Sequence, residues 1–421
     1  MRKNILRKIK TLGWRIKSIL AMYYYGNPAK KLKIVGVTGT NGKTTTATLL
    51  YKIATGLGYK AGLIGTAGNM IAGVKSDATH TTPDSITLTK LFKDMFDAGC
   101  EYVFMEVSSH ALDQKRVFGV KFTGAIFTNL THDHLDYHKN MTEYFLAKKK
   151  LFNMLPKSAF ALSNADDEHG KKMLEGIDAR KFLYEFFNVH GTATLQDKFV
   201  GEILKIYSSG LELTIGDTLV KSKLLGKFNA YNLLAVWSAS SLLGFDMNKV
   251  RSILENIEPP KGRFDHFTSP SGVLAIVDYA HTPDALEKIF KAVKDIKAPD
   301  SRIISVFGCG GDRDPMKRPI MGKIGAMNSD IVIMTSDNPR SEDPTMIIEV
   351  MKEALSPQLL EKVISMPLRR EAIREAVRLA QLNDIILVAG KGHEDYQEIK
   401  GVKSHFDDME ELKKALEENK K

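Results

Sequence analysis

Residues 33–46 carry the most specific chemistry in the chain and read Lys-Ile-Val-Gly-Val-Thr-Gly-Thr-Asn-Gly-Lys-Thr-Thr-Thr. The apolar run 34–37 predicts a buried parallel strand, and the pattern of 44–57 predicts a helix. A strand that enters a helix through glycines directs several N–H groups and the positive end of the helix dipole at one point, which suits a phosphate. Lys43 would then reach the β- and γ-phosphates of a nucleotide, and the Thr44 hydroxyl would contact Mg²⁺. An ordinary glycine turn is the alternative.

Acidic and histidine side chains further along the chain suit a divalent ion that bridges nucleotide phosphates. They are Glu106 and a cluster that contains His132, Asp133, His134, Asp136 and His138. For His132 and His138, a histidine-rich surface loop is the preferred interpretation. Three consecutive lysines at 148–150 would normally form a solvated helix face, and we expect this of at least two of them.

Several cations follow the predicted strands of the second half of the chain, namely Arg313, Lys317, Arg318 and Arg340. Because the planar arginine fork matches a carboxylate, they indicate a carboxylate-rich substrate. Arg340 lies on a proline-stiffened turn, and Glu394 can pair with a substrate ammonium. The alternative is a set of structural ion pairs, in which Arg340 would pair with Glu342 or Asp343.

The elements that must position these residues alternate between short apolar runs and helical segments, which predicts parallel sheets. The runs are 33–37, 61–65, 102–107, 124–128 and 158–162, and then 273–279, 303–307, 330–335, 363–366 and 384–389. Between the two series, 201–225 is typical of hairpin-like β structure and 228–243 of a helix. Ligands of such sheets bind beyond the carboxyl ends of the strands. Six of these ends carry polar residues, which indicates a substrate site shared by two domains.

We therefore expect an α/β protein with a central P-loop ATPase domain around a parallel sheet and a C-terminal Rossmann-like α/β domain. Pro259, Pro260 and Gly262 form the best linker. The predicted divisions are a basic segment at 1–31, the central domain at 32–260 and the C-terminal domain at 261–421. Two cysteines give no disulfide framework and favour a reducing cytoplasm.

The net charge of +10 arises at the start of the chain. Residues 1–33 contain ten Lys and Arg and no Asp or Glu, so the remainder is balanced at 50 basic and 50 acidic residues. This confinement argues against a nucleic-acid partner, and we expect a monomer with small-molecule substrates. Apolar residues recur at helical spacing at Ile5, Ile9, Leu12, Ile16, Ile19 and Tyr23, which predicts a basic amphipathic helix over 1–24. Such a helix either packs on its own domain or contacts an anionic membrane surface.

Seven motifs resemble, in order along the chain, those of the Mur ligase family. They are Gly39-Thr-Asn-Gly-Lys-Thr-Thr45, Glu106-Val-Ser-Ser-His-Ala-Leu112, Asp133-His-Leu-Asp-Tyr-His138, Asp278-Tyr-Ala-His-Thr-Pro-Asp-Ala285, Gly308-Cys-Gly-Gly-Asp-Arg-Asp314, Asp337-Asn-Pro-Arg340 and Gly390-Lys-Gly-His-Glu394. The resemblance covers residues 24–411. It implies a cytoplasmic ATP-dependent amide ligase of peptidoglycan precursor synthesis, working through an acyl phosphate. Within the family it is nearest to members that add meso-diaminopimelate to UDP-MurNAc-L-Ala-D-Glu.

The resemblance also implies roles for individual residues. Nucleotide binding falls to Gly39, Thr40, Asn41, Gly42, Lys43, Thr44, Thr45, Asn232, Arg263 and Asp278. Metal binding falls to Thr44, Glu106, His134 and Lys148, the last matching a lysine that is carbamylated in the family. Catalytic roles fall to Lys43, Glu106, Lys148 and His281. Substrate binding falls to Thr81, Thr82, Ser109, Gln114, Arg116, Arg313, Asp337, Asn338, Arg340, Gly390 and Glu394.

Two features depart from the family pattern. The N-terminal domain that grips the uridine nucleotide is expected to be lacking, because only a short segment precedes the P-loop strand. Leu368 also stands where the family has an aspartate. The alternatives are a related ligase with another acceptor, of the folylpolyglutamate or cyanophycin type, and a non-catalytic relative. Intact Lys43, Glu106, His134 and Lys148 argue against the second of these.

Overall fold

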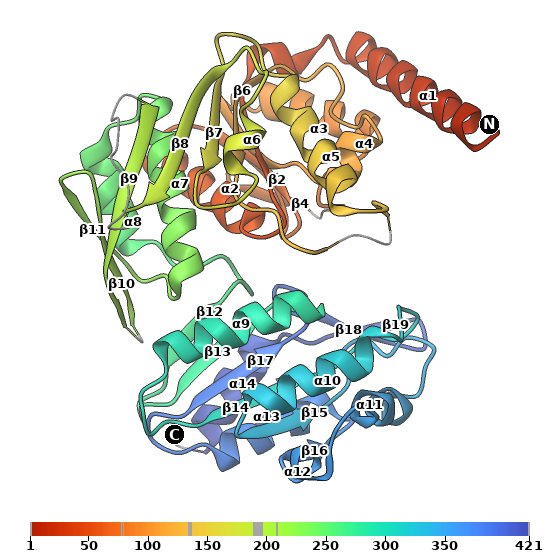
Figure 1. The fold of residues 1–421 in the computed structure, drawn as a ribbon, viewed down its shortest axis with the longest axis vertical. Coiled ribbons are helices and arrows are strands. Elements are labelled where there is room, and N and C mark those ends of the chain that lie inside the picture. Colours follow the sequence, from red (N-terminus) through yellow and green to blue (C-terminus); the bar gives the residue numbers. More distant parts are fainter. Residues whose placement is uncertain are drawn as a thin grey trace. The chain divides into compact units, whose positions relative to one another are not determined.

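The computed structural model describes residues 2–76, 78, 80–133, 137–187, 197–207 and 209–419, with side chains from residue 13 onward. The chain folds into two compact units (Figure 1). The first comprises Met1–Lys205, Leu211–Lys223 and Phe228–Ile257, and the second comprises Ile206–Gly210, Leu224–Lys227 and Glu258–Lys421. His134 and Asp136 of the predicted metal cluster lie outside the described residues.

Within the described residues, the first unit contains an 11-stranded sheet in the order β11-β10-β9-β8-β7-β6-β1-β5-β2-β3-β4. The strands are β1 (Lys33–Thr38), β2 (Ala61–Gly65), β3 (Gly68–Ile71), β4 (Val74–Ser76), β5 (Tyr102–Glu106), β6 (Phe122–Phe127), β7 (Phe160–Asn164), β8 (Arg180–Phe186), β9 (Lys198–Tyr207), β10 (Gly210–Ile215) and β11 (Thr218–Ser222). Neighbours from β9 through β2 pair in parallel, whereas β2 with β3, β3 with β4, and β10 with β11 pair antiparallel. The predicted parallel sheet is confirmed. Its central strands read as continuous apolar runs because both faces are buried.

The first unit also contains helices, several of which pack on this sheet. The helices are α1 (Arg2–Tyr24), α2 (Lys43–Gly56), α3 (Ser85–Asp97), α4 (Ser109–Asp113), α5 (Met141–Asn153), α6 (Gly170–Met173), α7 (Lys227–Leu242) and α8 (Met247–Asn256), with a 3-10 turn at Pro28–Lys31. The helix α1 packs against α3. Phe92 from α3, Phe127 from β6 and Leu151 from α5 share one core. The Asp84 carboxylate accepts hydrogen bonds from two N–H groups at the start of α3, which fixes the chain just before that helix.

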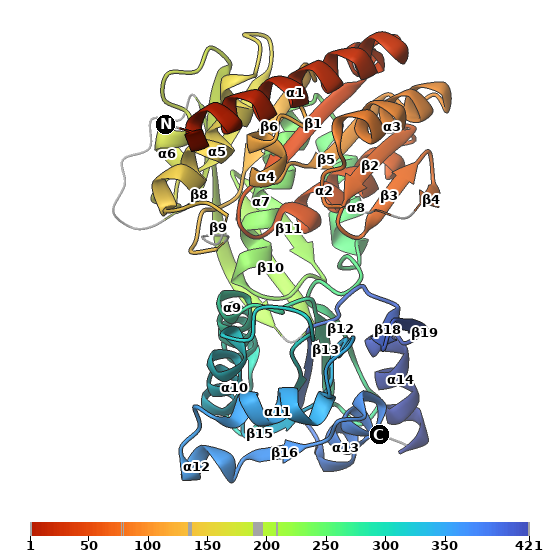
Figure 2. The ribbon, with the colours of Figure 1, turned by 90° about the vertical axis from the view of Figure 1, so that its right-hand side faces the viewer.

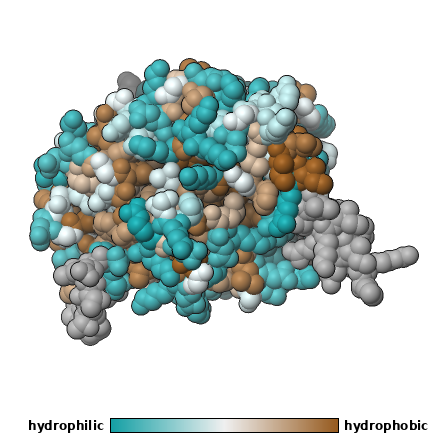
Figure 3. Space-filling view, turned by 90° about the horizontal axis from the view of Figure 1, so that it is seen from above, coloured by the Kyte–Doolittle hydropathy of each residue, from teal (hydrophilic) through white to brown (hydrophobic). Residues whose placement is uncertain are grey.

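The N-terminal helix packs on its own unit, but not through the part of the predicted apolar stripe whose side chains the structure describes. Ser18 and Ala21 are buried, and the Ser18 hydroxyl donates to the Lys115 carbonyl at 3.2 Å. Ile16, Ile19 and Tyr23 are 47, 51 and 89% exposed. Small residues allow close approach on the packed face, so the larger apolar residues point outward. Figure 3 shows apolar side chains gathered beside the grey N-terminal part of the helix. Among the described residues, no helix is long and apolar enough to span a bilayer.

In its described part, the second unit contains a 6-stranded sheet in the order β12-β13-β17-β14-β15-β16. The strands are β12 (Asp265–Thr268), β13 (Leu274–Asp278), β14 (Ile303–Phe307), β15 (Ile331–Met334), β16 (Val363–Ser365) and β17 (Ile385–Ala389). Only the β12–β13 pair in this described sheet is antiparallel. A separate hairpin consists of β18 (Tyr396–Ile399) and β19 (Val402–His405).

Helices cover both faces of the second sheet (Figure 2). Leu274 and Ile276 face one core, while Ala275 and Val277 face the other, as the two-residue period of a strand requires. The first core is closed by α9 (Pro283–Ile296), α10 (Lys317–Asn328) and α11 (Pro344–Lys352), and the second by α13 (Arg369–Leu379) and α14 (Asp408–Glu418). A short helix, α12 (Pro357–Leu360), precedes β16. The predicted Rossmann-like α/β arrangement is confirmed.

Candidate active site

The loop between β1 and α2 forms a phosphate-binding cradle. Gly39 and Gly42 have φ values of 155° and 82°. A Cβ on Gly39 would lie 1.8 Å from the Thr128 hydroxyl oxygen, so no larger residue fits there. The Lys43 ammonium folds back over the loop and donates to the carbonyl oxygens of Gly39 and Thr40 at 3.0 and 2.8 Å. The structure thus holds a cation over a glycine turn at a helix start, as the motif predicts.

Two asparagines anchor this loop. The Asn41 N–H donates to Asn129 Oδ1 at 2.9 Å, directly beyond β6. Asn232 on α7 is buried, and its Oδ1 would lie 2.5 Å from a Cβ on Gly42. Thr45 is buried in the first turn of α2. The predicted nucleotide residues of this unit are therefore brought together around one turn.

Glu106 ends β5 beside the first turn of α2. Its Oε2 accepts from the Thr44 hydroxyl at 2.9 Å, and its Oε1 accepts from the Thr66 N–H at 2.7 Å. The Thr66 hydroxyl also donates to Thr81 Oγ1 at 3.0 Å. No group of three His, Cys, Asp or Glu side chains gathers among the described residues, from which His134 is missing. Of the residues placed here, Thr44 and Glu106 offer the hard oxygen atoms that suit Mg²⁺.

Lys148 on α5 is 1% exposed, and its ammonium donates to the Gly39 carbonyl at 2.7 Å. The ammonium also lies 4.4 Å from the ring centre of Tyr144. Burial, followed by the nearby positive charge of Lys43, lowers the pKa of Lys148 well below its usual 10.5. A buried lysine with a low pKa presents a neutral, nucleophilic amine. Lys149 and Lys150 are half-buried on the same helix.

His138 is buried, so the surface-loop prediction is wrong for it. Its ring stacks on Tyr144 at 5.1 Å and lies 5.7 Å from His110, measured between ring centres. The aromatic neighbours come from α4 and α5, far apart in sequence, and no local pattern shows that they cover it. His132 is exposed, as expected.

The residues predicted to bind the muramyl peptide surround the end of β5. The Thr82 hydroxyl donates to the Glu106 carbonyl at 2.9 Å. Arg116 donates to the Thr82 carbonyl at 2.7 Å and to Gln114 Oε1 at 3.0 and 2.7 Å. The buried Ser109 hydroxyl finds no partner within the described part of the chain. These contacts tie the segment before α3 to Glu106, the carboxylate predicted to bind metal.

In the second unit, the end of β13 gathers the residues predicted to contact the nucleotide. The Asp278 carboxylate accepts from the Phe264 N–H at 2.8 Å, and burial raises the pKa of Asp278. The Arg263 guanidinium lies 4.6 Å from the ring centre of Tyr279. His281 Nδ1 lies 2.9 Å from the Tyr279 carbonyl oxygen. A flat cation on an aromatic ring provides a surface suited to a planar ligand.

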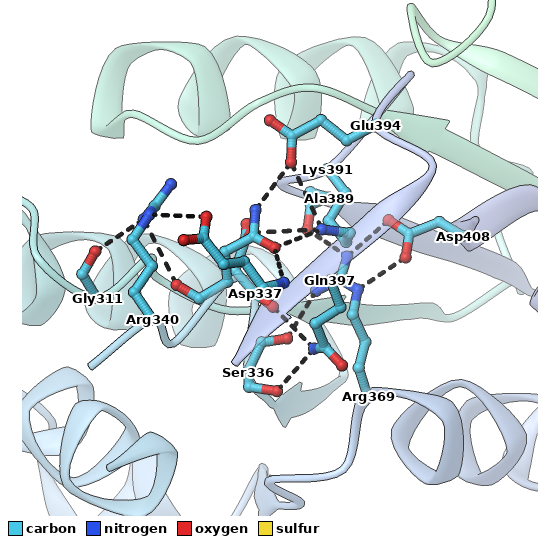
Figure 4. Close-up of polar contacts among 12 residues, drawn as sticks. Gly311, Ser336, Asp337, Arg340, Arg369, Ala389, Lys391, Glu394, Gln397 and Asp408 are labelled. Atoms are coloured by element: carbon cyan, nitrogen blue, oxygen red, sulfur yellow. Dashed lines mark hydrogen bonds and ion pairs between the residues drawn. The ribbon is translucent and has the colours of Figure 1, made fainter. Parts of the chain in front are cut away.

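Arg313 and Arg340 come together beyond β14 and β15. A Cβ on Gly310 would lie 3.0 Å from Arg340 Nη1 and 3.7 Å from Arg313 Cγ. Arg340 Nη1 donates to the Gly311 carbonyl at 2.7 Å, and its Nε lies 3.6 Å from a Glu398 oxygen (Figure 4). Arg313 is exposed. The structure thus places the Arg340 guanidinium and the aliphatic stem of Arg313 beside one glycine turn.

The alternative pairing of Arg340 with Glu342 or Asp343 is wrong. The Glu342 carboxylate instead accepts hydrogen bonds from Nη1 and Nη2 of Arg318, each at 2.8 Å. Asp343 accepts from the Thr345 N–H and caps α11. Glu342 and Asp343 are close to Arg340 in sequence, which suggested them as partners. In the structure their carboxylates are taken by Arg318 and by the first turn of α11.

Asn338 joins the two motifs at the ends of β15 and β17 (Figure 4). Its Nδ2 donates to Glu394 Oε2 at 2.9 Å, and its Oδ1 accepts from the Lys391 ammonium at 3.0 Å. Burial raises the pKa of Glu394, an effect that Lys391 opposes. A Cβ on Gly390 would lie 2.6 Å from an Asp337 oxygen, which explains this glycine. Sequence reasoning missed Lys391, although its place between two glycines in Gly-Lys-Gly marks it.

Comparison with known proteins agrees with this geometry. The family model of the Mur ligase middle domain matches residues 37–240, and that of the Mur ligase glutamate ligase domain matches residues 262–392. A UDP-N-acetylmuramoyl-L-alanyl-D-glutamate–2,6-diaminopimelate ligase of Phocaeicola vulgatus is 51% identical over 394 residues, covering 94% of this chain and 80% of that protein. The ligase of the same name from Clostridium botulinum is 44% identical, covering 95% of this chain and 81% of that protein.

Solved structures show the same relationship. The structure of a UDP-N-acetylmuramoyl-L-alanyl-D-glutamate–2,6-diaminopimelate ligase aligns with a TM-score of 0.65 and 34% identity, covering 93% of this chain and 79% of that one. The Mycobacterium tuberculosis folylpolyglutamate synthase aligns with a TM-score of 0.69 over 89% of this chain and 92% of that one, but at 17% identity it shows the fold alone. The fold and the P-loop site define a nucleotide-binding α/β enzyme of two units. The chain belongs to the Mur ligase family.

Proposed function

We propose that the chain is an ATP-dependent ligase that adds meso-diaminopimelate to UDP-MurNAc-L-Ala-D-Glu during peptidoglycan precursor synthesis. The observation that carries this proposal is the Arg340 guanidinium beside the turn at Gly310, with Glu394 held by Asn338. A guanidinium for a carboxylate and a carboxylate for an ammonium suit an amino acid that carries an additional carboxylate. The names of relatives at 51 and 44% identity support the same reaction.

In the proposed reaction, the γ-phosphoryl group of ATP passes to a carboxylate of the muramyl dipeptide, which yields an acyl phosphate and ADP. The deprotonated amine of diaminopimelate attacks the acyl carbon, and the tetrahedral intermediate expels phosphate to leave the amide. Lys43 would neutralise charge on the transferred phosphoryl group, and Mg²⁺ held by Thr44 and Glu106 would add positive charge there. Phosphoryl transfer requires mainly such positioning and charge neutralisation.

We assign the remaining predicted residues to substrate contacts. Asn232, Arg263, Asp278 and His281 would contact the nucleotide. The residues at the end of β5 would hold the muramyl peptide, namely Thr81, Thr82, Ser109, Gln114 and Arg116. The proposed division is a basic segment at 1–31, a central domain at 32–260 and a C-terminal domain at 261–421. Asn232 and the muramyl-peptide residues belong to the central domain, and Arg263, Asp278 and His281 belong to the C-terminal domain.

Lys148 is proposed to carry a carbamate. Its neutral amine would attack CO₂ and lose a proton, which turns a buried cation into an anion. The low pKa of Lys148 supports this reaction, because only the unprotonated amine is nucleophilic. An anion at this position would also be attracted to Lys43, whereas the ammonium form is repelled.

The test measures phosphate release with ATP, UDP-MurNAc-L-Ala-D-Glu and a panel of amino acids. We expect release that depends on all three substrates and is fastest with meso-diaminopimelate. A parallel reaction replaces the muramyl dipeptide by a folate acceptor and uses glutamate as the amino acid. Faster phosphate release in that reaction would instead support the folylpolyglutamate-type alternative. Release with no member of the panel would count against a ligase.

We also propose that this cytoplasmic enzyme contacts anionic membranes reversibly through residues 1–24. The outward face of α1 combines exposed Ile16, Ile19 and Tyr23 with a segment that lacks acidic residues. Each basic residue near an anionic surface contributes about 1 kcal/mol, so binding should weaken strongly with salt.

Vesicle sedimentation tests the membrane proposal. Leu20→Asp changes a residue of α1 that is 62% exposed, and Leu382→Asp is a matched control at 70% exposure in the second unit. Leu20→Asp should reduce binding to phosphatidylglycerol vesicles, while the control and wild type should bind alike. Equal sedimentation of both variants, or of a version lacking residues 1–24, would contradict the proposal.

A further inference from the structure

A fully buried ion pair lies beneath the ends of β15 and β17 (Figure 4). Arg369 begins α13, and Asp408 begins α14. Arg369 Nε and Nη2 each donate to one Asp408 oxygen at 2.7 Å, and both side chains are 0% exposed. Asp408 therefore fixes the plane of the guanidinium in the bidentate geometry that suits arginine.

The other donors of this guanidinium reach two backbone carbonyls. Arg369 Nη2 donates to the Ala389 oxygen at 3.0 Å, and Nη1 donates to the Ser336 oxygen at 3.3 Å. Ser336 immediately precedes Asp337, and Ala389 immediately precedes Gly390. One buried side chain thus holds the backbone at the residue directly before each motif.

Neighbouring contacts leave these two motifs little freedom to move separately. Gln397 Nε2 donates to the Ser336 hydroxyl at 3.1 Å and to the Asp337 carbonyl at 2.8 Å. The position of a Cβ on Gly390, 2.6 Å from an Asp337 oxygen, shows how closely the motifs approach. A shift of one carbonyl would therefore move the side chains above it.

We propose that Arg369 is a positioning residue for the amino-acid site, holding Asn338, Arg340 and Glu394 at their working separation through these two carbonyls. This inference rests on the proposed function for the identity of the amino acid. Arg369 touches no substrate in this role. Leu368, which stands where the family has an aspartate, is 70% exposed and has no part in the network.

A second ion pair in the same unit serves as a matched control. Arg302 donates to Asp384 through Nε at 3.1 Å and Nη2 at 2.6 Å, and to the Leu379 carbonyl at 2.9 Å. Arg302 and Asp384 directly precede β14 and β17, at the opposite ends of these strands from Phe307 and Ala389. The Arg302 side chain is 34% exposed and that of Arg369 is 0% exposed, so the loss of stability should be smaller for Arg302. A purely structural role would leave the KM for the amino acid unchanged in variants of both arginines, whereas a positioning role raises it only for Arg369.

The experiment compares Arg369→Lys with Arg302→Lys. Each variant keeps its charge but loses the fork, and both should unfold at a lower temperature than wild type. Only Arg369→Lys should raise the KM for meso-diaminopimelate, by about tenfold or more, while its KM for ATP stays within about twofold of wild type. Equal KM values for the amino acid in the two variants would overturn the proposal.

A substrate-free measurement separates this inference from the proposed function. Hydrogen exchange at the amides of Arg340 and Gly390, which donate to Glu398 and Asp278 carbonyls, should accelerate in Arg369→Lys and remain at the wild-type rate in Arg302→Lys. If wild type shows no turnover with diaminopimelate, the proposed function fails. The hydrogen-exchange rates of these two amides would still test whether Arg369 positions the two motifs. Unchanged exchange in Arg369→Lys refutes this role.

The double variant Arg369→Gln/Asp408→Asn guards against a failure to fold. It removes both buried charges together, so no unpaired ion remains. The glutamine side chain at residue 369 is shorter than arginine and cannot reach both carbonyls, so the same rise in amino-acid KM and in exchange is expected. Wild-type values in this variant would equally overturn the positioning role.

Discussion

Replacing Arg340 by alanine should abolish the preference for meso-diaminopimelate over lysine. The two amino acids differ by one carboxylate at the far end of a long side chain. Arg340 keeps N–H groups available for it, because Nη1 and Nε contact Gly311 and Glu398 and a guanidinium carries five donors. A carboxylate bound by the fork would replace water at a side chain that is only 21% exposed.

The magnitude follows from the number of bonds lost. Two charge-assisted hydrogen bonds at about 1.5 kcal/mol each give about 3 kcal/mol, or roughly a 150-fold loss in kcat/KM for meso-diaminopimelate. With lysine, kcat/KM should change by less than about threefold, because lysine makes no such bonds. Arg340→Lys should fall between these limits, since it keeps the charge and loses the fork.

The assay measures phosphate release at amino-acid concentrations below KM, for both amino acids and all variants. Arg378→Ala provides a matched control, because it removes one arginine that is paired with Glu375 and 64% exposed on α13. Alanine, lysine and arginine at residue 340 must all adopt the same left-handed backbone conformation. We therefore expect Arg340→Ala and Arg340→Lys to fold as wild type does. If wild type prefers lysine, or Arg340→Ala keeps the wild-type ratio, Arg340 is not the selector.

Three further predictions concern the phosphate end of the site. Lys43→Ala and Glu106→Gln should each slow phosphate release at least about a hundredfold at saturating substrate, and near-wild-type rates would remove them from the mechanism. Lys148→Ala should lose ligase activity and regain part of it with added formate or acetate, and full activity without an additive would refute the carbamate. In carbonate-free buffer, Lys148→Met should raise the melting temperature at about pH 7, because the folded state binds fewer protons at this lysine than the unfolded state. That gain should shrink as the pH rises toward 10.5, where both states are neutral, and a pH-independent difference would contradict the lowered pKa.

Much of the fold could be predicted because the sheets are parallel and buried. Both the strand predicted at 61–65 and that at 303–307 have the bounds found in the structure, since each is a mainly apolar run that begins directly after a basic residue. The P-loop could also be located, because its glycines serve a local backbone need. Such signals depend on neighbours in sequence alone.

The features that sequence missed depend on how separate elements pack together. His138 lies only six residues before Tyr144, but its burial also requires α4, which brings His110 to 5.7 Å from its ring centre. The stripe at Ile16, Ile19 and Tyr23 indicates an amphipathic helix, but the face that packs is decided by which surface receives it. The role of Arg369 is equally hidden, because its partner Asp408 is 39 residues away.

The backbone conformation of Arg340 depends on a segment distant in sequence more than on the Asp-Asn-Pro-Arg motif itself. Arg340 has a φ of 51°, a left-handed conformation that costs a non-glycine residue about 1 kcal/mol or more. Its N–H donates to the Glu398 carbonyl at 3.1 Å, and its own carbonyl accepts from the Lys400 N–H at 2.7 Å. The β18–β19 hairpin therefore holds the strained backbone at both ends. Proline at the preceding position stiffens the turn, but it does not choose the left-handed state. The hairpin holds the backbone of Arg340, so if Arg340 selects the amino acid, a change in that hairpin should alter the ratio of kcat/KM for meso-diaminopimelate and lysine without touching the substrate.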